Sequence, residues 1–153
     1  MVVTVEPLFD KGQTCSTIFD ISKQYANDLY LCYSRERALS ELNPNQIYNI
    51  VRLIEYEADI PGTEVVMRPI HVIRHGKADC KKKTTILSSY AILRGIPFRY
   101  ACTSKKADGR IHHIFPQYKI LGRYINFDAT YPWYYIGEPK VVTNVEYFNP
   151  VVQ

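Results

Sequence analysis

The chain has 153 residues, within the range of about 100–200 that is typical of one domain. Hydrophobic residues make up 46% and charged residues 22%, a balance that supports a buried core and excludes disordered, collagen-like and coiled-coil chains. The net charge of +4 is too small to indicate nucleic acid or an anionic membrane as a partner. We therefore expect a single domain over residues 1–153.

Nothing in the sequence marks the chain for a membrane or for export. No stretch approaches the ~20 consecutive apolar residues that cross a bilayer, and the N-terminus lacks the basic and then apolar order of a signal peptide. The four cysteines, at positions 15, 32, 80 and 102, form no C-x-x-C pair that would indicate a zinc ribbon or a dithiol redox site. We therefore expect free thiols in a reducing cytoplasm, and no cofactor.

Helical spacing dominates the first half of the chain. Residues 2–8 are expected to form a short strand, and apolar residues then recur every three or four positions over 18–32, as on the buried face of a helix. Asn43-Pro44 predicts the cap and first residue of a second helix. This helix should stop near Asp59, because Pro61-Gly62 cannot continue it.

The second half of the chain is rich in β-branched and aromatic residues, which favour strands. It begins with a predicted helix over 80–94, closed by Gly95 and Pro97. Turns at 107–109 and 121–122 indicate antiparallel hairpins. The strands are expected over residues 98–103, 111–120, 122–129 and 141–148. The predicted fold class is α+β, with helices first and a meander of strands after them.

Cys80 is a candidate for chemistry because the predicted helix begins at its position. Unpaired N–H groups and the positive end of the helix dipole favour a thiolate there, and the thiolate is the nucleophilic form. Lys81, Lys82 and Lys83 follow, although cations in a first turn oppose the dipole. We expect these lysines to be flexible and largely solvated, and to favour the thiolate through a field that salt screens. Taken alone, the cysteine is better explained as a small core residue beside a solvated basic corner.

A base and a carboxylate lie in the strands that follow. His113 falls in the second predicted strand, and Asp128 ends the third. A tight turn at Leu121-Gly122 pairs residues whose numbers sum to about 243, which places His113 opposite residues around 128–130. Asp128 could then orient the imidazole, and the imidazole could take the proton of a thiol. His112 and His113 face opposite sides of the strand, so only one of them can serve.

Four short motifs follow one another along the chain. They are Gly76-Lys77-Ala78-Asp79-Cys80, a helix ending in Leu93-Arg94-Gly95-Ile96-Pro97, His113-Ile114-Phe115, and Phe127-Asp128-Ala129-Thr130. In this order they resemble the transglutaminase-like superfamily of papain-type acyl-transfer domains, most strongly over residues 47–133. The resemblance implies a papain-like or transglutaminase-like core, in which the helix that carries the nucleophile packs on an antiparallel sheet. It assigns Cys80 as the nucleophile, His113 as the base and Asp128 as the orienting carboxylate, and it leaves His112 outside the triad.

The same resemblance implies a cysteine-dependent acyltransferase or protease that acts on amide bonds of a protein or peptide through an acyl-enzyme. Small members of this kind resemble those of bacterial and bacteriophage genomes, which makes a virion-associated location an alternative to the cytoplasm. The chain departs from the family at Lys81-Lys82-Lys83, where acidic residues are common, at the residues inserted between Gly76 and Asp79, and at Phe115, where tryptophan often stands. These departures concern substrate preference more than the triad.

Acyl transfer also requires hydrogen-bond donors for the oxyanion that forms on the substrate. The backbone N–H of Cys80, at the start of the helix, is the expected first donor. The sequence assigns no second donor. Gln46 and Tyr56 lie upstream, and nothing in the sequence places either of them beside the thiol.

A zinc-binding hydrolase is a rival interpretation. His71 and His75 are four residues apart, and Asp79 and Cys80 follow them. A helix that starts at Pro69 would place both imidazoles on one face, from which they could bind zinc together with Cys80. The pair lacks the glutamate of the usual helical zinc motif, so the signal is weak.

The remaining rival is a catalytically idle domain of the same fold with a binding or structural role. Its basic residues could form a patch for an acidic partner or nucleic acid, although no nucleic-acid-binding motif accompanies them. These residues are Lys77, Lys81, Lys82, Lys83, Lys105, Lys106 and Arg110. The sequence leaves the partner and the oligomeric state open.

Overall fold

The computed structural model describes residues 3–5, 11–61, 63–104 and 113–150. The fold is mixed α+β, as predicted, with helices concentrated in the first half and the main sheet in the second. In chain order the elements are β1 (Val3–Val5), α1 (Lys11–Gln24), the 3-10 helix η1 (Ala26–Tyr30), β2 (Tyr33–Ser34), β3 (Arg37–Ala38), the 3-10 helix η2 (Leu39–Glu41), α2 (Pro44–Arg52), β4 (Glu55–Tyr56), β5 (Val65–Met67), α3 (Pro69–His75), β6 (Lys77–Ala78), α4 (Cys80–Arg94), β7 (Phe98–Ser104), β8 (His113–Ile120), β9 (Arg123–Asn126) and β10 (Asn144–Phe148).

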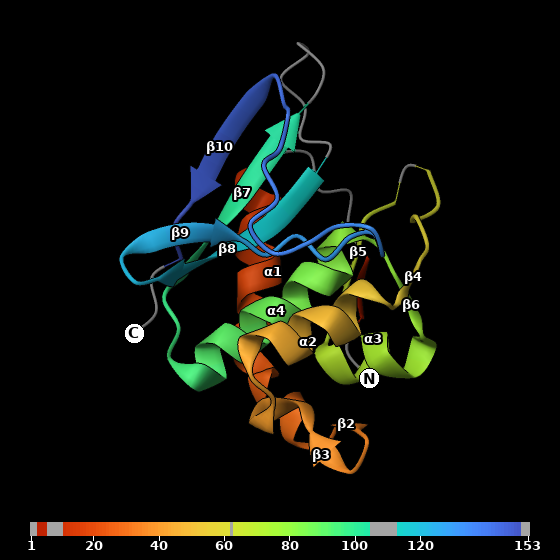
Figure 1. Cartoon of the computed structure of the whole chain (residues 1–153). Coiled ribbons are helices and arrows are strands. Elements are labelled where there is room, and N and C mark those ends of the chain that lie inside the picture. Colours follow the sequence, from red (N-terminus) through yellow and green to blue (C-terminus); the bar gives the residue numbers. More distant parts are fainter. Residues whose placement is uncertain (1–2, 6–10, 62, 105–112, 151–153) are drawn as a thin grey trace.

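Helix α4 lies at the centre of the fold, in contact with α1, α2, α3 and β8 (Figure 1). It is buried on all faces from Lys82 to Ala91. Asp79 caps its first turn by accepting the N–H of Lys82 at 3.1 Å, and Gly95 ends it with a left-handed φ of 66°. The predicted bounds of this helix are confirmed, because both of its ends are determined by local signals.

A four-stranded antiparallel sheet, in the order β10-β7-β8-β9, packs against α4 through β8 (Figure 1). Leu121 and Gly122 have positive φ angles of 52° and 78°, as a two-residue hairpin turn requires. The turn pairs Gln117 with Asn126, which is the predicted register. Strand β9 ends at Asn126 rather than at 129, so Asp128 lies just beyond the strand instead of at its last position.

Three further expected strands are present where the structure describes them, whereas the short strands β2 to β6 were not predicted. β1 falls within the expected range 2–8, and β10 falls within 141–148 and pairs antiparallel with β7. β8 is described from His113 onward. The predicted turn at 107–109 and the first two residues of the strand over 111–120 lie outside the described residues.

Two helices end earlier than their apolar patterns indicate. α1 stops at Gln24 and the chain continues as η1, although Leu29 and Cys32 are still buried. The apolar spacing therefore predicted correctly which residues are buried, but not that they lie on one continuous helix. α2 stops at Arg52 instead of near Asp59. The reason is tertiary, because β4, immediately after α2, pairs in parallel with β6.

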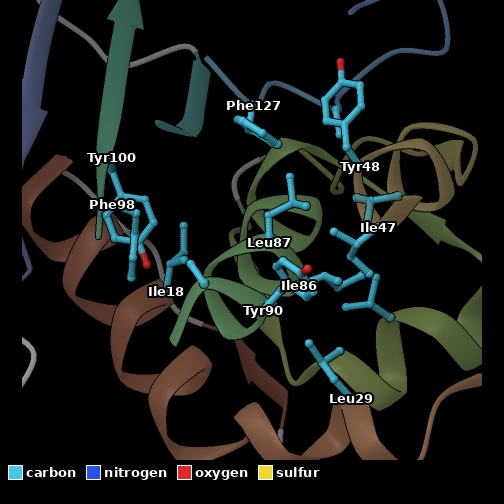
Figure 2. Close-up of a cluster of buried hydrophobic side chains, with 14 of the residues drawn as sticks. Ile18, Leu29, Ile47, Tyr48, Ile86, Leu87, Tyr90, Phe98, Tyr100 and Phe127 are labelled. Atoms are coloured by element: carbon cyan, nitrogen blue, oxygen red, sulfur yellow. The ribbon is translucent and has the colours of Figure 1, made fainter. Parts of the chain in front are cut away.

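The core joins the helices to the sheet around α4. Figure 2 shows Leu87 of α4 between Ile18 of α1 and Ile47 of α2. Two of the buried tyrosines direct their hydroxyl groups to backbone carbonyls: Tyr118 donates to Leu87, and Tyr48 donates to Asp128 at 2.8 Å. Tyr48 therefore connects the core directly to the loop that carries Asp128. Within the described ranges, every helix is too short or too polar to cross a membrane.

Candidate active site

Cys80 is the first residue of α4, and its side chain is partly exposed while the other three cysteines are buried. The position follows from the local sequence, because Asp79 takes the N-cap and accepts the Lys82 N–H. Helix geometry leaves the N–H of the first residue without an intrahelical acceptor, and the dipole of the 15-residue helix favours negative charge there. The sulfur therefore lies where a thiolate and a developing oxyanion are both stabilised.

His113 and Asp128 contact each other across the β8–β9 hairpin, as the register predicts. The Nε2 atom of His113 lies 2.6 Å from Oδ2 of Asp128. His113 is the first residue of β8, pairs with Thr103 of β7, and keeps 23% of its side chain exposed. Because Nε2 faces Asp128, Nδ1 is the ring nitrogen left for the sulfur of Cys80. His112, its predicted outward-facing neighbour, lies outside the described residues.

The Asp128 carboxylate is almost completely buried and is surrounded by donors. Thr130 donates to Oδ1 through its N–H at 3.1 Å and its hydroxyl at 2.6 Å, and Oδ2 receives His113 and the Nζ of Lys140, the latter at 3.0 Å. Burial raises the pKa of Asp128, but the hydrogen bond and charge of His113, with the charge of Lys140, lower it to about 2. Asp128 is therefore a fixed anion at neutral pH.

His113 is held in its charged form by its two neighbours. Burial lowers the pKa of His113, yet side-chain hydrogen bonds with Asp128 and Cys80, together with their charges, raise it to about 10. The imidazole thus contacts Asp128 directly and lies within electrostatic range of Cys80. The structure therefore pairs His113 with Asp128, as an imidazole and its orienting carboxylate require, and places the charge of Cys80 within reach of the same ring.

The three lysines after Cys80 are not the flexible, solvated side chains that the sequence led us to expect. Lys81, Lys82 and Lys83 are only 12%, 7% and 1% exposed. Lys82 contacts Asp59 at 2.6 Å, and Lys81 contacts Asp59 at 3.4 Å as well as other carboxylates near the start of α4. The expectation was wrong because acidic residues from the 59–64 segment, distant in sequence, cover this turn.

This finding also removes the basis for a solvated basic patch at this position. Lys81 and Lys82 are paired with carboxylates, Lys83 is buried, and Lys77 contacts Glu57 at 4.0 Å. The other three, Lys105, Lys106 and Arg110, lie outside the described residues. A patch for an acidic partner or nucleic acid therefore has no support from the lysines at the start of α4.

The rival zinc site is not assembled by the described residues. His71 and His75 do lie on one short helix, α3, which Gly76 ends in a left-handed conformation, as expected. His75, however, contacts Glu57 at 2.9 Å. Across the described ranges, no three His, Cys, Asp or Glu side chains lie close enough together to hold a metal ion.

The two upstream candidates for an oxyanion donor are placed differently. Gln46 forms a capping box with Asn43 at the start of α2, which occupies both its side chain and its N–H. Tyr56 is paired in β4 with Ala78, two residues before Cys80. Burial raises the pKa of Tyr56 to about 12, with contributions from the charges of Tyr131 and Cys80. Tyr56 therefore lies within electrostatic range of Cys80, whereas the side chain of Gln46 is occupied at the start of α2.

An aromatic cluster that sequence reasoning did not weigh adjoins the site. We call Tyr56, Tyr131, Trp133 and Tyr134 the aromatic cluster. Tyr131 lies 4.9 Å from Tyr56 between ring centroids and stacks on Trp133 at 4.8 Å with an interplanar angle of 6°. The charge of Cys80 contributes to the raised pKa of Tyr134 as it does for Tyr56. The signal was available, since Tyr131-Pro132-Trp133-Tyr134 directly follows the Asp128-Ala129-Thr130 motif.

The comparisons with known proteins define the fold only coarsely. No protein-family model and no curated protein matches this sequence. Of two solved chains that match in structure, one from Cytophaga hutchinsonii is described as a "Putative Cysteine Protease"; it shares 17% identity with a TM-score of 0.42, over 92% of this chain and 54% of that one. This chain thus spans about half the length of that protein. The likeness is too low to assign a family or any residue role.

Proposed function

We propose that this protein is a cysteine-dependent enzyme that cleaves or transfers acyl groups at amide bonds of a protein or peptide, with Cys80 as nucleophile, His113 as proton carrier and Asp128 as orienting carboxylate. The observation that carries the proposal is the placement of His113, which is hydrogen-bonded to Asp128 at 2.6 Å and whose pKa is raised by Cys80 at the start of α4. An N-terminal helix position, an imidazole and a buried carboxylate provide the three functions of a papain-like site. The packing of α4 against β8 supports a papain-like or transglutaminase-like core.

The chemistry follows from the charges of the three groups. The sulfur attacks the amide carbonyl carbon as a thiolate, and the carbonyl π electrons move to the oxygen. When the tetrahedral intermediate collapses, the C–N bond breaks and Nδ1 of His113 gives its proton to the leaving amine. The products of this half-reaction are the free amine, a thioester on Cys80 and a neutral His113.

The second half-reaction uses the neutral imidazole as a base. It takes a proton from water, for hydrolysis, or from an amine, for transfer, while that oxygen or nitrogen attacks the thioester. The sulfur leaves as a thiolate and His113 returns to its charged form. The backbone N–H of Cys80 is the donor that the helix start provides for the oxyanion in both steps. The Tyr56 hydroxyl is the second donor we propose, because β4 pairs Tyr56 with Ala78, two residues before Cys80, and the charge of Cys80 acts on this hydroxyl.

The reactivity of the four cysteines toward a neutral alkylating probe tests this proposal directly. Cys15, Cys32 and Cys102 are buried and serve as internal controls in the same molecule. With iodoacetamide and peptide mass spectrometry, we expect native Cys80 to react faster at neutral pH than a thiol in the unfolded chain, and His113→Ala to abolish that advantage. Cys80 reacting no faster than an unfolded thiol would contradict the proposal and favour an idle domain with a binding role.

A second measurement separates hydrolysis from transfer. A peptide library is incubated with the protein, with and without a primary amine such as a lysine derivative, and the products are identified by mass. Release of free acids indicates hydrolysis, and incorporation of the amine indicates transfer. Cys80→Ala is the control in both arms, since it removes the atom that forms the thioester while leaving the N-cap of α4 in place.

A further inference from the structure

Lys83 is a lysine buried within the fold, one turn after Cys80 on α4, and only 1% of it is exposed. Its Nζ contacts three backbone carbonyl oxygens: Ile54 at 2.7 Å, Thr130 at 2.8 Å and Arg52 at 3.5 Å. An ammonium group has three N–H donors, which match the three acceptors, whereas a neutral amine would turn its lone pair toward one of them. The geometry therefore holds Lys83 in its charged form.

The three carbonyls belong to segments that carry the site. Thr130 is the residue whose N–H and hydroxyl hold Oδ1 of Asp128 at 3.1 and 2.6 Å. Ile54 lies two residues before Tyr56, between α2 and β4. A single side chain from the helix of Cys80 thus ties together the Asp128 loop and the segment that leads to Tyr56. Loss of this connection would free the Asp128 loop from the nucleophile helix.

The charge of Lys83 has no ion-pair partner among the described residues, unlike those of Lys81 and Lys82. Burial lowers the pKa of Lys83 to about 8, opposed by the charges of Asp128 and Cys80, which raise it. Such a charge inside the protein is screened by salt far less than one at the surface. The other ionisable groups of the surrounding elements include Arg52 and Tyr48 of α2, Glu55 and Tyr56 of β4, His113, Tyr118 and Lys119 of β8, and Lys140 beyond Asp128.

We propose that Lys83 is a positioning residue of the active site. It fixes the Asp128 loop against α4 so that Asp128 and His113 face Cys80, and its buried charge favours the thiolate form of Cys80. The proposal rests on the proposed function, in which Cys80 is the nucleophile. The cation that favours the thiolate is thus an interior ammonium tied to the backbone, and it does not depend on solvated lysines. Its influence on the thiol should consequently persist at high salt.

The pH dependence of Cys80 alkylation tests this role. In Lys83→Met, which keeps the length of the side chain and removes its charge, we expect alkylation about tenfold slower at pH values below the midpoint of the wild-type profile, at both low and high salt. Lys82→Met is the matched control, because Lys82 is also buried on α4 but pairs with Asp59 and touches none of the three carbonyls. The rate of Cys80 alkylation in Lys82→Met should stay within about twofold of the wild-type rate at each pH.

The outcomes separate this inference from the proposed function. A wild-type Cys80 that reacts no faster than an unfolded thiol contradicts the proposed function. If wild-type Cys80 is reactive but the pH profile of its alkylation is the same in Lys83→Met, the role of Lys83 is overturned. An equal change of that profile in Lys82→Met also overturns it. A shift in Lys83→Met that disappears at high salt also overturns it, because the charge would then be acting from solvent.

A measurement on unmodified Lys83 covers the case in which Lys83→Met fails to fold. The coupling between two titrating groups is mutual, so a thiolate that is stabilised by Lys83 must in turn stabilise the ammonium. NMR titration of the Lys83 Cε resonance, in protein labelled at lysine, gives the pKa of this side chain in the wild type and in Cys80→Ala. We expect a lower pKa in Cys80→Ala, and equal values would overturn the proposal.

Discussion

Lys140 and His113 share a single carboxylate oxygen: the Nζ of Lys140 lies 3.0 Å, and Nε2 of His113 2.6 Å, from Oδ2 of Asp128. Lys140 also lies 3.5 Å from the centroid of the Tyr134 ring, within the aromatic cluster. A second cation at the same oxygen disfavours the charged imidazole and so opposes the rise in the pKa of His113. A proton carrier must release its proton, and Lys140 makes that release easier than the pair with Asp128 alone would.

Replacing Lys140 by Met should therefore raise the pKa of His113 above its present value of about 10, because the cation that opposes the imidazolium is removed. NMR titration of the His113 ring resonances measures this directly. Lys23→Met, at the exposed end of α1, removes the same charge far from the site and should leave the His113 titration unchanged. A lower or unaltered pKa of His113 in Lys140→Met would show that the two cations do not compete.

The neighbouring histidines should differ sharply in their effect on Cys80. His113→Ala removes the imidazole that contacts Asp128 and that we propose as the proton carrier for Cys80, and we expect alkylation near neutral pH to slow by about 10²-fold. His112→Ala should leave the rate nearly unchanged, because adjacent residues of a strand face opposite sides. The measurement is the alkylation rate of Cys80 in the two variants. Equal effects would mean that His112 also faces the thiol.

The buried Asp128 carboxylate should contribute to stability in acid in a defined direction. Its pKa is lowered from 3.8 to about 2, so the stabilisation is fully present above about pH 4 and is lost as the pH falls through about 2. The difference corresponds to about 2 kcal/mol of unfolding free energy. Urea unfolding from pH 5 to 2, at intervals of about one pH unit, should show a steeper loss for wild type than for Asp128→Asn. Parallel curves would contradict a lowered pKa at this position.

Lys81, at the start of α4, should contribute to the free energy of unfolding. Lys81 contacts the buried carboxylate of Asp79, and also Asp59 at 3.4 Å, so Lys81→Met leaves Asp79 without its cation and should lower the free energy of unfolding by about 3 kcal/mol. Lys77→Met is the control, because Lys77 is 45% exposed and its ion pair with Glu57 should contribute less than about 1 kcal/mol. Urea unfolding of both variants decides the matter. A small change in the free energy of unfolding in both variants would indicate that Lys81 is solvated, as the sequence led us to expect.

The aromatic cluster should affect binding of the substrate more than the chemical steps. Trp133 is 71% exposed while stacked on Tyr131, so its outer face is open beside the site. If a peptide substrate lies on it, Trp133→Ala should raise KM about threefold to tenfold and change kcat little. Steady-state kinetics on a peptide from the library screen give both constants. Tyr135→Ala, at a residue that is 57% exposed, is the control, and an equal effect there would contradict a role for the cluster.

Much of the placement of Cys80, His113 and Asp128 could be predicted from the sequence, because the signals involved are local. Asp79 and Gly95 determine the two ends of α4, and a left-handed residue at the end of a helix is a property of glycine itself. The turn at Leu121-Gly122 determines the register of its hairpin, and the register brings His113 to Asp128. Each of these relationships spans a few residues of chain or one tight turn.

The tertiary structure alone decided the surroundings of these three residues. The spacing of Lys81, Lys82 and Lys83 predicted a charged surface, but Asp59 covers this turn from more than twenty positions away, and no local rule reports that approach. Lys140 reaches Asp128 from a segment without regular structure, for which hydrophobic periodicity carries no signal. Burial converts a lysine from a screened surface charge into a fixed interior one, and burial depends on which distant segments pack together.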